Sequence, residues 1–384
     1  MSDFYADLLN RLHEDGVYRT IQQIEIDGKY VTGEGQRMLN LSGNDYLGLA
    51  SLEKNDSFPF SNYRMSSSSS RLLTGNDPVV EKFEAELAEA YSAPSALLWD
   101  SGYHANTGLI PVLCQGNTLI LADKLVHASM IDGIRLSGVD FRRFRHNDTS
   151  HLHTLLERYG SDYERVWILL ESVYSMDGDI APLQEILELK NKYPNLYIYL
   201  DEAHGVGVFG HSGLGLCEEL GAIQHVDVIL GTLGKALASV GAFTIMSQTL
   251  RQLAISSARS FIFSTSLPPL CIAWSRHMFD VMRHRSDLRS HLRELWSIVS
   301  QELGVDASSP IIPIRIPGAH KCAEVARKLV EQGYYVRPIR RPTVPPGTER
   351  IRLSLSAAMA EEEVYSMCQT FKKILRAYEV SMEE

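Results

Sequence analysis

Leu196-Tyr197-Ile198-Tyr199-Leu200-Asp201-Glu202-Ala203-His204 is the stretch that decides the fold of this chain. A short apolar run that ends in an aspartate is typical of a buried strand with a polar carboxyl end. Similar runs recur along the chain with helix-length segments between them, at residues 96–99, 118–122, 166–170, 226–230 and 242–246. Strands that alternate with helices imply a mostly parallel sheet covered on both faces, so we predict an α/β fold.

Several of these runs end in a polar residue, and this places the expected chemistry. Asp100, Asp123 and Glu171 follow their runs as Asp201 follows its own. In open α/β sheets, ligands bind outside the carboxyl ends of the strands. We therefore look for functional side chains at this edge.

The run at 226–230 leads into Gly231-Thr232-Leu233-Gly234-Lys235-Ala236. A lysine in a turn of small residues can form a Schiff base, and a strand-end aspartate can hold a buried cation. Glycine backbone amides and the Thr232 hydroxyl suit a phosphate group. Lys235 and Asp201 together supply the protein's half of pyridoxal phosphate (PLP) chemistry.

His204 lies three residues after Asp201, so the two share a face if the strand end turns helical. Asp201 would then pair with the pyridine nitrogen, and His204 would hydrogen-bond the phenolic oxygen of the ring. Taken alone, the pair is more typical of a helix-capping aspartate and a core histidine with satisfied hydrogen bonds. Ser101-Gly102-Tyr103 after the run at 96–99 is a natural phosphate cradle, and His127 beyond Asp123 could stack on a flat ring.

Two other patterns suggest different chemistry. Gly205-Val206-Gly207-Val208-Phe209-Gly210 matches the dinucleotide fingerprint, but four residues separate it from the strand where the fingerprint needs a tight turn. His146-Asn147-Asp148 with His151 and His153 offers possible metal ligands without a standard spacing, and we interpret it as a polar surface turn. We therefore expect neither a nicotinamide site nor a metal.

Composition excludes several classes of protein. The chain has 384 residues and a net charge of -10 without a long basic run, which disfavours nucleic acid as a partner. The acidic start lacks the pattern of a signal peptide, and we find no apolar stretch of membrane-spanning length. Five scattered cysteines show neither a disulfide framework nor metal spacing, so we expect a cytoplasmic protein.

The organisation of the chain suggests an N-terminal segment at 1–45, a large domain at 46–270 and a small α+β domain at 271–384. We expect a helix at 3–15 and two strands around an Asp-Gly turn at 24–31. Asp77-Pro78 predicts the start of a helix. The small domain should contain a long helical stretch at 270–303, strands at 311–316, 334–337 and 350–355, and helices at 319–332 and 361–378.

Taken together, these residues resemble those of a known family, the α-oxoamine synthases, which are PLP-dependent enzymes of fold type I. The resemblance runs from about Arg19 to the last helix. Its motifs are Asn44-Asp45-Tyr46-Leu47-Gly48-Leu49, Ser70-Arg71-Leu72-Leu73-Thr74-Gly75, Ser101-Gly102-Tyr103, Asp123 with His127-Ala128-Ser129, Ser175-Met176-Asp177-Gly178-Asp179, Asp201-Glu202-Ala203-His204, Gly231-Thr232-Leu233-Gly234-Lys235, Phe263-Ser264-Thr265, Pro342-Thr343-Val344-Pro345 and Arg350-Ile351-Arg352. This implies a large domain with a mostly parallel seven-stranded sheet and a smaller C-terminal domain.

The resemblance also implies roles for individual residues. Lys235, His127, Asp201 and His204 would be catalytic. The cofactor set would be Gly102, Tyr103, His127, Ser175, Asp201, His204, Thr232, Lys235, Ser264 and Thr265. Ser264 and Thr265 would reach the phosphate of a neighbouring subunit, which implies a homodimer with shared active sites. Arg352 with Asn44 would bind the amino acid carboxylate, and Arg19 and Thr343 the acyl substrate.

Within the family, Asn44-Asp45-Tyr46 and the run at 70–76 favour the branch that condenses L-alanine with a pimeloyl thioester of CoA or of a carrier protein. Sister branches that use glycine or serine remain alternatives. A PLP-binding protein without catalysis and a nicotinamide oxidoreductase are alternatives from other classes. Two departures from the family bear on acyl specificity: Ser66 to Ser69 replace a glycine-rich turn, and Met359 replaces a histidine.

Overall fold

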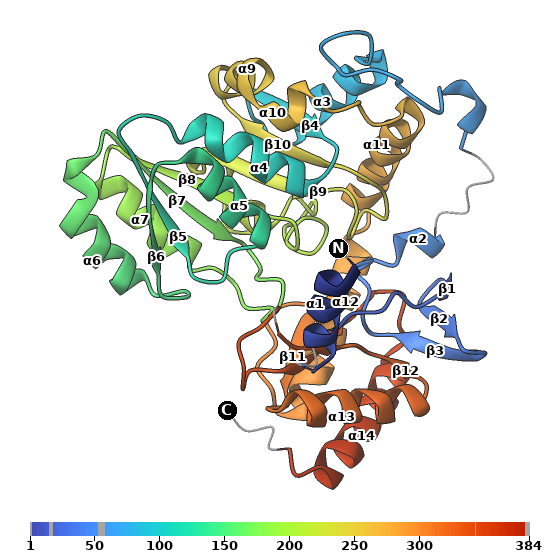
Figure 1. The fold of residues 1–384 in the computed structure, drawn as a ribbon. Helices are drawn as coiled ribbons and strands as arrows, with labels where there is room; N and C mark the ends of the chain where they lie inside the picture. The colour runs from blue at the N-terminus through green and yellow to red at the C-terminus, as the bar shows by residue number, and fades with distance from the viewer. Residues whose placement is uncertain (1, 15–17, 53–57, 342, 381–384) are drawn as a thin grey trace. The chain divides into compact units, whose positions relative to one another are not determined.

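The computed structural model describes residues 2–14, 18–52, 58–341 and 343–380 (Figure 1). The chain forms two compact units. Unit 1 comprises Met1–Leu52, Met176–Gly178 and Ser290–Glu384, and unit 2 comprises Glu53–Ser175 and Asp179–Arg289.

Unit 2 is built on a seven-stranded sheet in the order β4-β10-β9-β8-β7-β5-β6. Its strand β10 is antiparallel to both neighbours, and the remaining pairs are parallel. This confirms the predicted mostly parallel sheet. The strands are β4 (Ser95–Trp99), β5 (Thr118–Asp123), β6 (Asp140–Phe144), β7 (Arg165–Glu171), β8 (Leu196–Asp201), β9 (Val228–Thr232) and β10 (Ala242–Met246).

Helices cover this sheet because both sets of alternating strand side chains are apolar. On one face, Leu169 and Tyr199 pack into a cluster with the helices that follow β4, β5 and β10. Their neighbours Ile168 and Ile198, which point to the other face, are equally buried. Figure 1 shows α4 and α5 side by side against the sheet. The helices of eight or more residues are α3 (Pro78–Ala90), α4 (Gly102–Leu113), α5 (Ala128–Ser137), α6 (Thr149–Tyr159), α7 (Leu183–Lys192), α9 (Gln248–Ser257) and α11 (Pro269–Arg283); α8 (Leu216–Glu219) and α10 (Arg259–Ile262) are single turns.

Helix α3 begins as the sequence predicts. The Asp77 carboxylate accepts a hydrogen bond from the Val79 amide at 3.2 Å, and Pro78 occupies the first turn. By contrast, the apolar runs do not reveal β6, whose first four residues are exposed. It is an edge strand that pairs with β5 alone, so its side chains do not need to be apolar.

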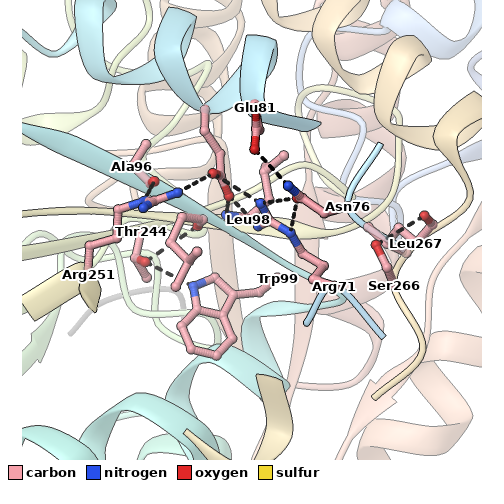
Figure 2. A network of polar contacts seen from close by, with 12 residues as sticks. Arg71, Asn76, Glu81, Ala96, Leu98, Trp99, Thr244, Arg251, Ser266 and Leu267 are labelled. Atoms are coloured by element: carbon pink, nitrogen blue, oxygen red, sulfur yellow. Dashed lines mark hydrogen bonds and ion pairs between the residues drawn. The ribbon is translucent and has the colours of Figure 1, made fainter. Parts of the chain in front are cut away.

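A buried ion network centred on Glu84 ties α3 to the sheet and to a preceding loop (Figure 2). The Glu84 carboxylate accepts hydrogen bonds from Arg71, from Arg251 of α9 at 2.8 Å and from the Leu98 amide of β4 at 2.8 Å. Arg71 also donates to Asn76 at 2.8 Å. Arg71 therefore anchors the Ser70–Gly75 motif through its ion pair with Glu84 and its hydrogen bond with Asn76.

Unit 1 contains two small sheets. One has the order β1-β2-β3-β12 and the other β11-β14-β13. The predicted hairpin is present, with Asp27 opposite Tyr30 and Gly28 at a φ of +58°. The strands are β1 (Glu25–Asp27), β2 (Tyr30–Gly33), β3 (Gln36–Asn40), β11 (Ile311–Arg315), β12 (Tyr334–Tyr335), β13 (Pro338–Ile339) and β14 (Arg350–Ser354); the helices are α1 (Ser2–Glu14), α2 (Leu49–Leu52), α13 (Ala319–Glu331) and α14 (Glu361–Ala377).

Two expectations for the C-terminal part are confirmed in part. The strand expected at 334–337 is shorter: β12 ends at Tyr335 and pairs with β3, whereas β13 follows at Pro338–Ile339 and pairs with β14 in the other sheet. The helical stretch at 270–303 is two helices, α11 and α12 (Ser286–Leu303). The ion pair between Arg285 and Asp287 at 2.8 Å lies at this break, which neither glycine nor proline marks in the sequence.

None of the described helices is both long and apolar enough to cross a bilayer.

Candidate active site

The candidate site lies at the carboxyl edge of the unit 2 sheet. Asp123, Glu171, Asp201 and Thr232 end the parallel strands β5, β7, β8 and β9. Glu171 and Asp201 are direct register partners. The carboxyl edge of the sheet, where the sequence predicts the functional side chains, therefore carries three buried carboxylic side chains and one hydroxyl.

The Asp201 side chain is held in one orientation by two donors. Its Oδ2 accepts from Asn106 Nδ2 at 3.0 Å, and its Oδ1 accepts from the Ala203 amide at 2.9 Å. The Tyr199 hydroxyl in turn donates to Asn106 Oδ1 at 2.8 Å. Two hydrogen bonds thus fix the side chain in a position from which it could bind the ring nitrogen of a cofactor.

Asn106 is a residue of the candidate site that sequence reasoning missed. It lies on α4 and is almost fully buried between the apolar residues of that helix. A lone buried asparagine in an apolar helix needs hydrogen-bond partners, and that was the available signal. Its partners, Asp201 and the Ser129 hydroxyl at 2.9 Å, become visible only in the fold.

Lys235 and His204 meet in the same unit. The distance from Lys235 Nζ to His204 Nε2 is 2.8 Å, and His204 is buried whereas Lys235 is half-buried. The turn that carries Lys235 requires a small residue at Gly231, because a Cβ there would collide with the Phe243 ring. The predicted lysine is therefore presented by a tightly packed strand end.

His127 is the residue before α5. Its Nδ1 accepts from the Ser129 amide at 3.2 Å and lies 2.7 Å from the Ser129 hydroxyl. The residue keeps access to solvent, but partial burial of the imidazole lowers the pKa of His127 below its ordinary value. The Asp201 carboxylate opposes this shift, and the Lys235 ammonium adds to it. A ring fixed at one nitrogen, with a bias toward the neutral form, suits stacking on a planar group.

The expected phosphate cradle occupies the start of α4. The Ser101 hydroxyl caps the helix by accepting from the His104 amide at 3.1 Å. A Cβ on Gly102 would lie 3.0 Å from Thr232 Cγ2, so glycine permits this close approach of two strand ends. Helix amides beside a threonine hydroxyl form a suitable anion site. Tyr103 is half exposed, and its hydroxyl donates to Asp132.

Three further predicted cofactor residues lie in loops of unit 2. Ser175 is half-buried and follows β7 at a distance of four residues from Glu171. Ser264 and Thr265 lie between α10 and α11, directly after Phe263, which is exposed. Their contacts with a cofactor stay predictions.

The predicted substrate residues pair up within unit 1. The Arg352 side chain is buried on β14 and donates to Asn44 Oδ1 at 3.3 Å and to the Tyr46 hydroxyl at 3.2 Å. Arg19 donates to the Thr343 hydroxyl at 2.9 Å. The structure therefore brings together each pair for which the sequence predicts a shared role.

Of the two departures from the family pattern, the serine run has a structural explanation, and nothing in the structure explains the methionine at 359. Ser68 adopts a φ of +51°, a left-handed conformation that ordinarily favours glycine, and its amide donates to the Ser66 hydroxyl at 3.0 Å. The Ser67 hydroxyl donates to the Leu267 carbonyl at 2.8 Å. Met359 is buried, and its carbonyl accepts from His291 at 2.8 Å. The serine hydroxyls thus stabilise the turn that glycine would otherwise supply.

The glycine pattern at 205–210 is part of a turn, and the next helix, α8, begins at Leu216. The strand–turn–helix context of a dinucleotide site is therefore not met, as expected. Glu202 connects the start of this segment to its end, because its carboxylate accepts hydrogen bonds from the amides of Leu216 and Cys217 at 3.1 and 2.8 Å. Glu202 has a structural role at the start of α8.

His146 and Asn147 lie in a turn, as the sequence suggests, but the His146 side chain is partly buried and bridges two carboxylates. Its Nδ1 lies 2.9 Å from Asp123 and its Nε2 2.5 Å from Asp179. Burial alone would lower the pKa of His146, but the hydrogen bonds with the two carboxylates raise it to about 10. His146 is therefore a cationic bridge between β5 and the loop after Ser175, and the Asn147 amide adds a 2.9 Å bond to Asp123.

These residues fit PLP by the chemistry of their donors and by the shape of the cradle. An oriented carboxylate, a lysine amine, two imidazoles and a helix N-terminus with a close-packed glycine all belong to unit 2. They match the ring nitrogen, carbonyl carbon, ring hydroxyl, ring face and phosphate of that cofactor. The class that the fold and site define is a PLP-dependent enzyme.

Comparisons with known proteins agree. The model of the family "Aminotransferase class I and II" matches residues 36–371. A protein of Haemophilus influenzae (strain ATCC 51907 / DSM 11121 / KW20 / Rd), named provisionally as an 8-amino-7-oxononanoate synthase, is 46% identical over 94% of this chain and 98% of its own length. A similarly named protein of Neisseria meningitidis serogroup C is 45% identical over 95% of this chain and 99% of its own.

Solved structures give the same class. A serine palmitoyltransferase structure with PLP as an internal aldimine has a TM-score of 0.87 at 26% identity and covers 99% of this chain and 98% of that one. The 8-amino-7-oxononanoate synthase of Francisella tularensis has a TM-score of 0.75 at 25% identity over 89% of this chain and 99% of its own.

The chain therefore belongs to the class I and II aminotransferase family, whose fold it shares and whose cofactor is PLP. Within that family it is an acyl-transferring enzyme of the type named 8-amino-7-oxononanoate synthase among its relatives.

Proposed function

We propose that this enzyme condenses L-alanine with a pimeloyl thioester to give 8-amino-7-oxononanoate, with release of CO2 and of the thiol, in biotin biosynthesis. The observation that carries the proposal is the 2.8 Å contact between Lys235 and His204 in the unit that also presents the oriented Asp201 carboxylate. The names of the relatives support the choice of reaction.

Bound PLP supplies an electron sink for the carbanion chemistry. Asp201 keeps the ring nitrogen protonated, because its carboxylate is already fixed by Asn106. His204 donates to the ring hydroxyl, His127 covers the ring face, and Gly102, Tyr103, Thr232 and Ser175 complete the cofactor contacts. Lys235 is the base that takes the proton from the Cα of the amino acid.

Arg352 binds the carboxylate of the amino acid, because its guanidinium is buried and already oriented by Asn44 and Tyr46. Arg19 and Thr343 contact the acyl donor. The donor is pimeloyl-CoA or a pimeloyl carrier protein, and the Ser66–Ser69 turn and Met359 bear on the length of the acyl chain.

A second candidate is a sister reaction with serine or glycine. Its support is the TM-score of 0.86 and the 29% identity to the serine palmitoyltransferase of Sphingomonas wittichii over 98% of both chains. The two reactions share the cofactor residues and differ in the amino acid and the acyl donor.

The test is a titration of the purified holoenzyme with L-alanine, glycine and L-serine, followed by pimeloyl-CoA. We expect L-alanine to perturb the visible absorbance of the bound cofactor at the lowest concentration, and thiol release to follow the addition of pimeloyl-CoA. Lys235→Ala should lower turnover at least about 10³-fold while PLP still binds. A preference for serine or glycine, or no thiol release, would move the protein to the sister reaction.

We further propose a homodimer with shared active sites. Leu73, Met65 and Phe263 are large apolar residues of unit 2 with exposed fractions of 79%, 75% and 73%. Phe263 directly precedes Ser264 and Thr265, the residues expected to reach the phosphate of a second subunit. Exposed apolar surface of this kind favours a protein interface.

We place the protein in the cytoplasm. Its five cysteines are all free thiols, and four of them are buried. Thiols persist in a reducing compartment. Burial raises the pKa of Cys114 above its ordinary value, which keeps that thiol unreactive.

A further inference from the structure

Glu171 is a buried carboxyl group at the cofactor edge for which the proposed chemistry has no role. It ends β7, directly beside Asp201 on β8, and only 3% of it is exposed. Its Oε1 has no hydrogen-bond partner among the described residues. A buried carboxylate with an unpartnered oxygen is strongly disfavoured, whereas the uncharged acid is tolerated.

The groups around Glu171 come from four elements. Asp201 faces it from β8, Lys235 from the turn after β9, and the backbone amides of His127 and Ser175 from the turns after β5 and β7. Burial raises the pKa of Glu171 well above its ordinary value, and the Asp201 carboxylate raises it further. The Lys235 ammonium and the two amides oppose this shift without reversing it. Tyr174, on the same segment as Ser175, has its own pKa raised by burial and partly by Glu171.

Two buried carboxyl groups on neighbouring strands cannot both ionise easily, so the pair retains a proton. The hydrogen bonds decide which residue keeps it. Asp201 accepts from Asn106 and Ala203, and both donors stabilise its anion. Glu171 has a bare oxygen instead. The proton therefore belongs on Glu171.

We propose that Glu171 is a positioning residue that remains an uncharged carboxylic acid, supports the turns that carry His127 and Ser175, and leaves the negative charge to Asp201. This rests on the proposed roles of those three residues in holding the cofactor. A second anion beside Asp201 would compete with it for the positive charge of Lys235 and of the ring. An uncharged acid keeps the packing and the amide contacts without that competition.

The first test compares denaturant unfolding of the apoprotein between pH 4 and 9 for the wild type and Glu171→Gln. Glutamine has the shape of the uncharged acid and cannot ionise. Since the folded pKa lies above the unfolded value of about 4.3, folding of the wild type takes up a proton above that pH. The stabilising contribution of the Glu171 proton is fully present below about pH 4.3 and is lost as pH rises through the folded pKa.

We therefore expect Glu171→Gln to gain stability relative to the wild type as pH rises, by up to about tenfold in the folding equilibrium constant per pH unit. The other titrating groups are shared by both proteins, so the difference isolates Glu171. Glu164→Gln, at an exposed position just before β7, controls for the loss of one carboxylate. A difference that is flat, or that slopes the other way, overturns the proposal, and so does failure of Glu171→Gln to fold.

The second test measures PLP binding to the apoproteins. We expect the dissociation constant of Glu171→Gln to stay within about threefold of the wild type, and that of Glu171→Ala to rise at least about tenfold, because the turns of His127 and Ser175 lose their support. A tenfold loss in Glu171→Gln would show that the charge is needed and would overturn the proposal. Neither test uses a substrate, so a preference for glycine or serine would leave both results unchanged.

Discussion

At the scale of single residues, the orientation of Asp201 depends on a chain of side chains from two elements, β8 and α4. Tyr199 on β8 donates to Asn106 on α4, and Asn106 donates to Asp201. Burial raises the pKa of Tyr199 well above its ordinary value, so its hydroxyl remains a donor. Each link fixes the next, and the carboxylate is oriented before the cofactor binds.

Asn106→Ala should weaken PLP binding by about 10- to 100-fold, because it leaves Asp201 Oδ2 without its donor, a change of about 1.5–3 kcal/mol for a charged acceptor. Titration of the apoprotein with PLP measures this. Thr107→Ala removes a hydroxyl from the next position of α4 and serves as the matched control. Equal affinity of the two variants would contradict the role of Asn106.

At the scale of elements, Glu84 joins α3, β4, α9 and the Ser70–Gly75 loop (Figure 2). Its side chain is about 95% buried and contacts two guanidinium groups. Buried networks of this kind add little net stability over apolar packing, but removing one partner leaves buried charges uncompensated.

Glu84→Ala should lower the free energy of unfolding by about 3–5 kcal/mol, because Arg71 and Arg251 lose their common carboxylate. Denaturant unfolding followed by circular dichroism measures the change. Glu89→Ala, at an exposed position of the same helix, should cost less than about 1 kcal/mol. Similar costs for both variants would mean that the network does not stabilise the fold.

At the scale of the whole molecule, the exposed apolar residues of unit 2 are the feature that a single chain leaves unexplained. Phe263 directly precedes Ser264 and Thr265, to which the family resemblance assigns cofactor contacts, and Leu73 is exposed in the Ser70–Gly75 motif. A second copy that covers them would bring its Ser264 and Thr265 to a phosphate site.

Phe263→Asp should shift the protein toward monomer in sedimentation and weaken PLP binding, because a charge in an apolar interface must be desolvated. Leu136→Asp is the control, since Leu136 is also exposed, at 66%, but lies on α5 away from the predicted interface segments. A monomeric wild type, or a dimer that Phe263→Asp leaves intact, would contradict the shared active site.

The sequence by itself determined the alternation of strands and helices, which follows from apolar runs of strand length. It also predicted the edge of the sheet that carries the candidate site and, through short motifs at strand ends and the family resemblance, the residues Lys235, Asp201, His204 and His127. Strand β6 was not predicted because an edge strand does not need apolar side chains. The break between α11 and α12 was not predicted because no glycine or proline marks it in the sequence.

Only the tertiary structure decided how the site is organised. Asn106 and Asp201 are 95 residues apart in the chain, and Lys235 and His204 are 31 apart. The bridging role of His146 and the uncharged state inferred for Glu171 depend on carboxylates from other strands. Hydrogen bonding, burial and pKa are properties of the space around a side chain, and folding alone determines which distant residues fill that space.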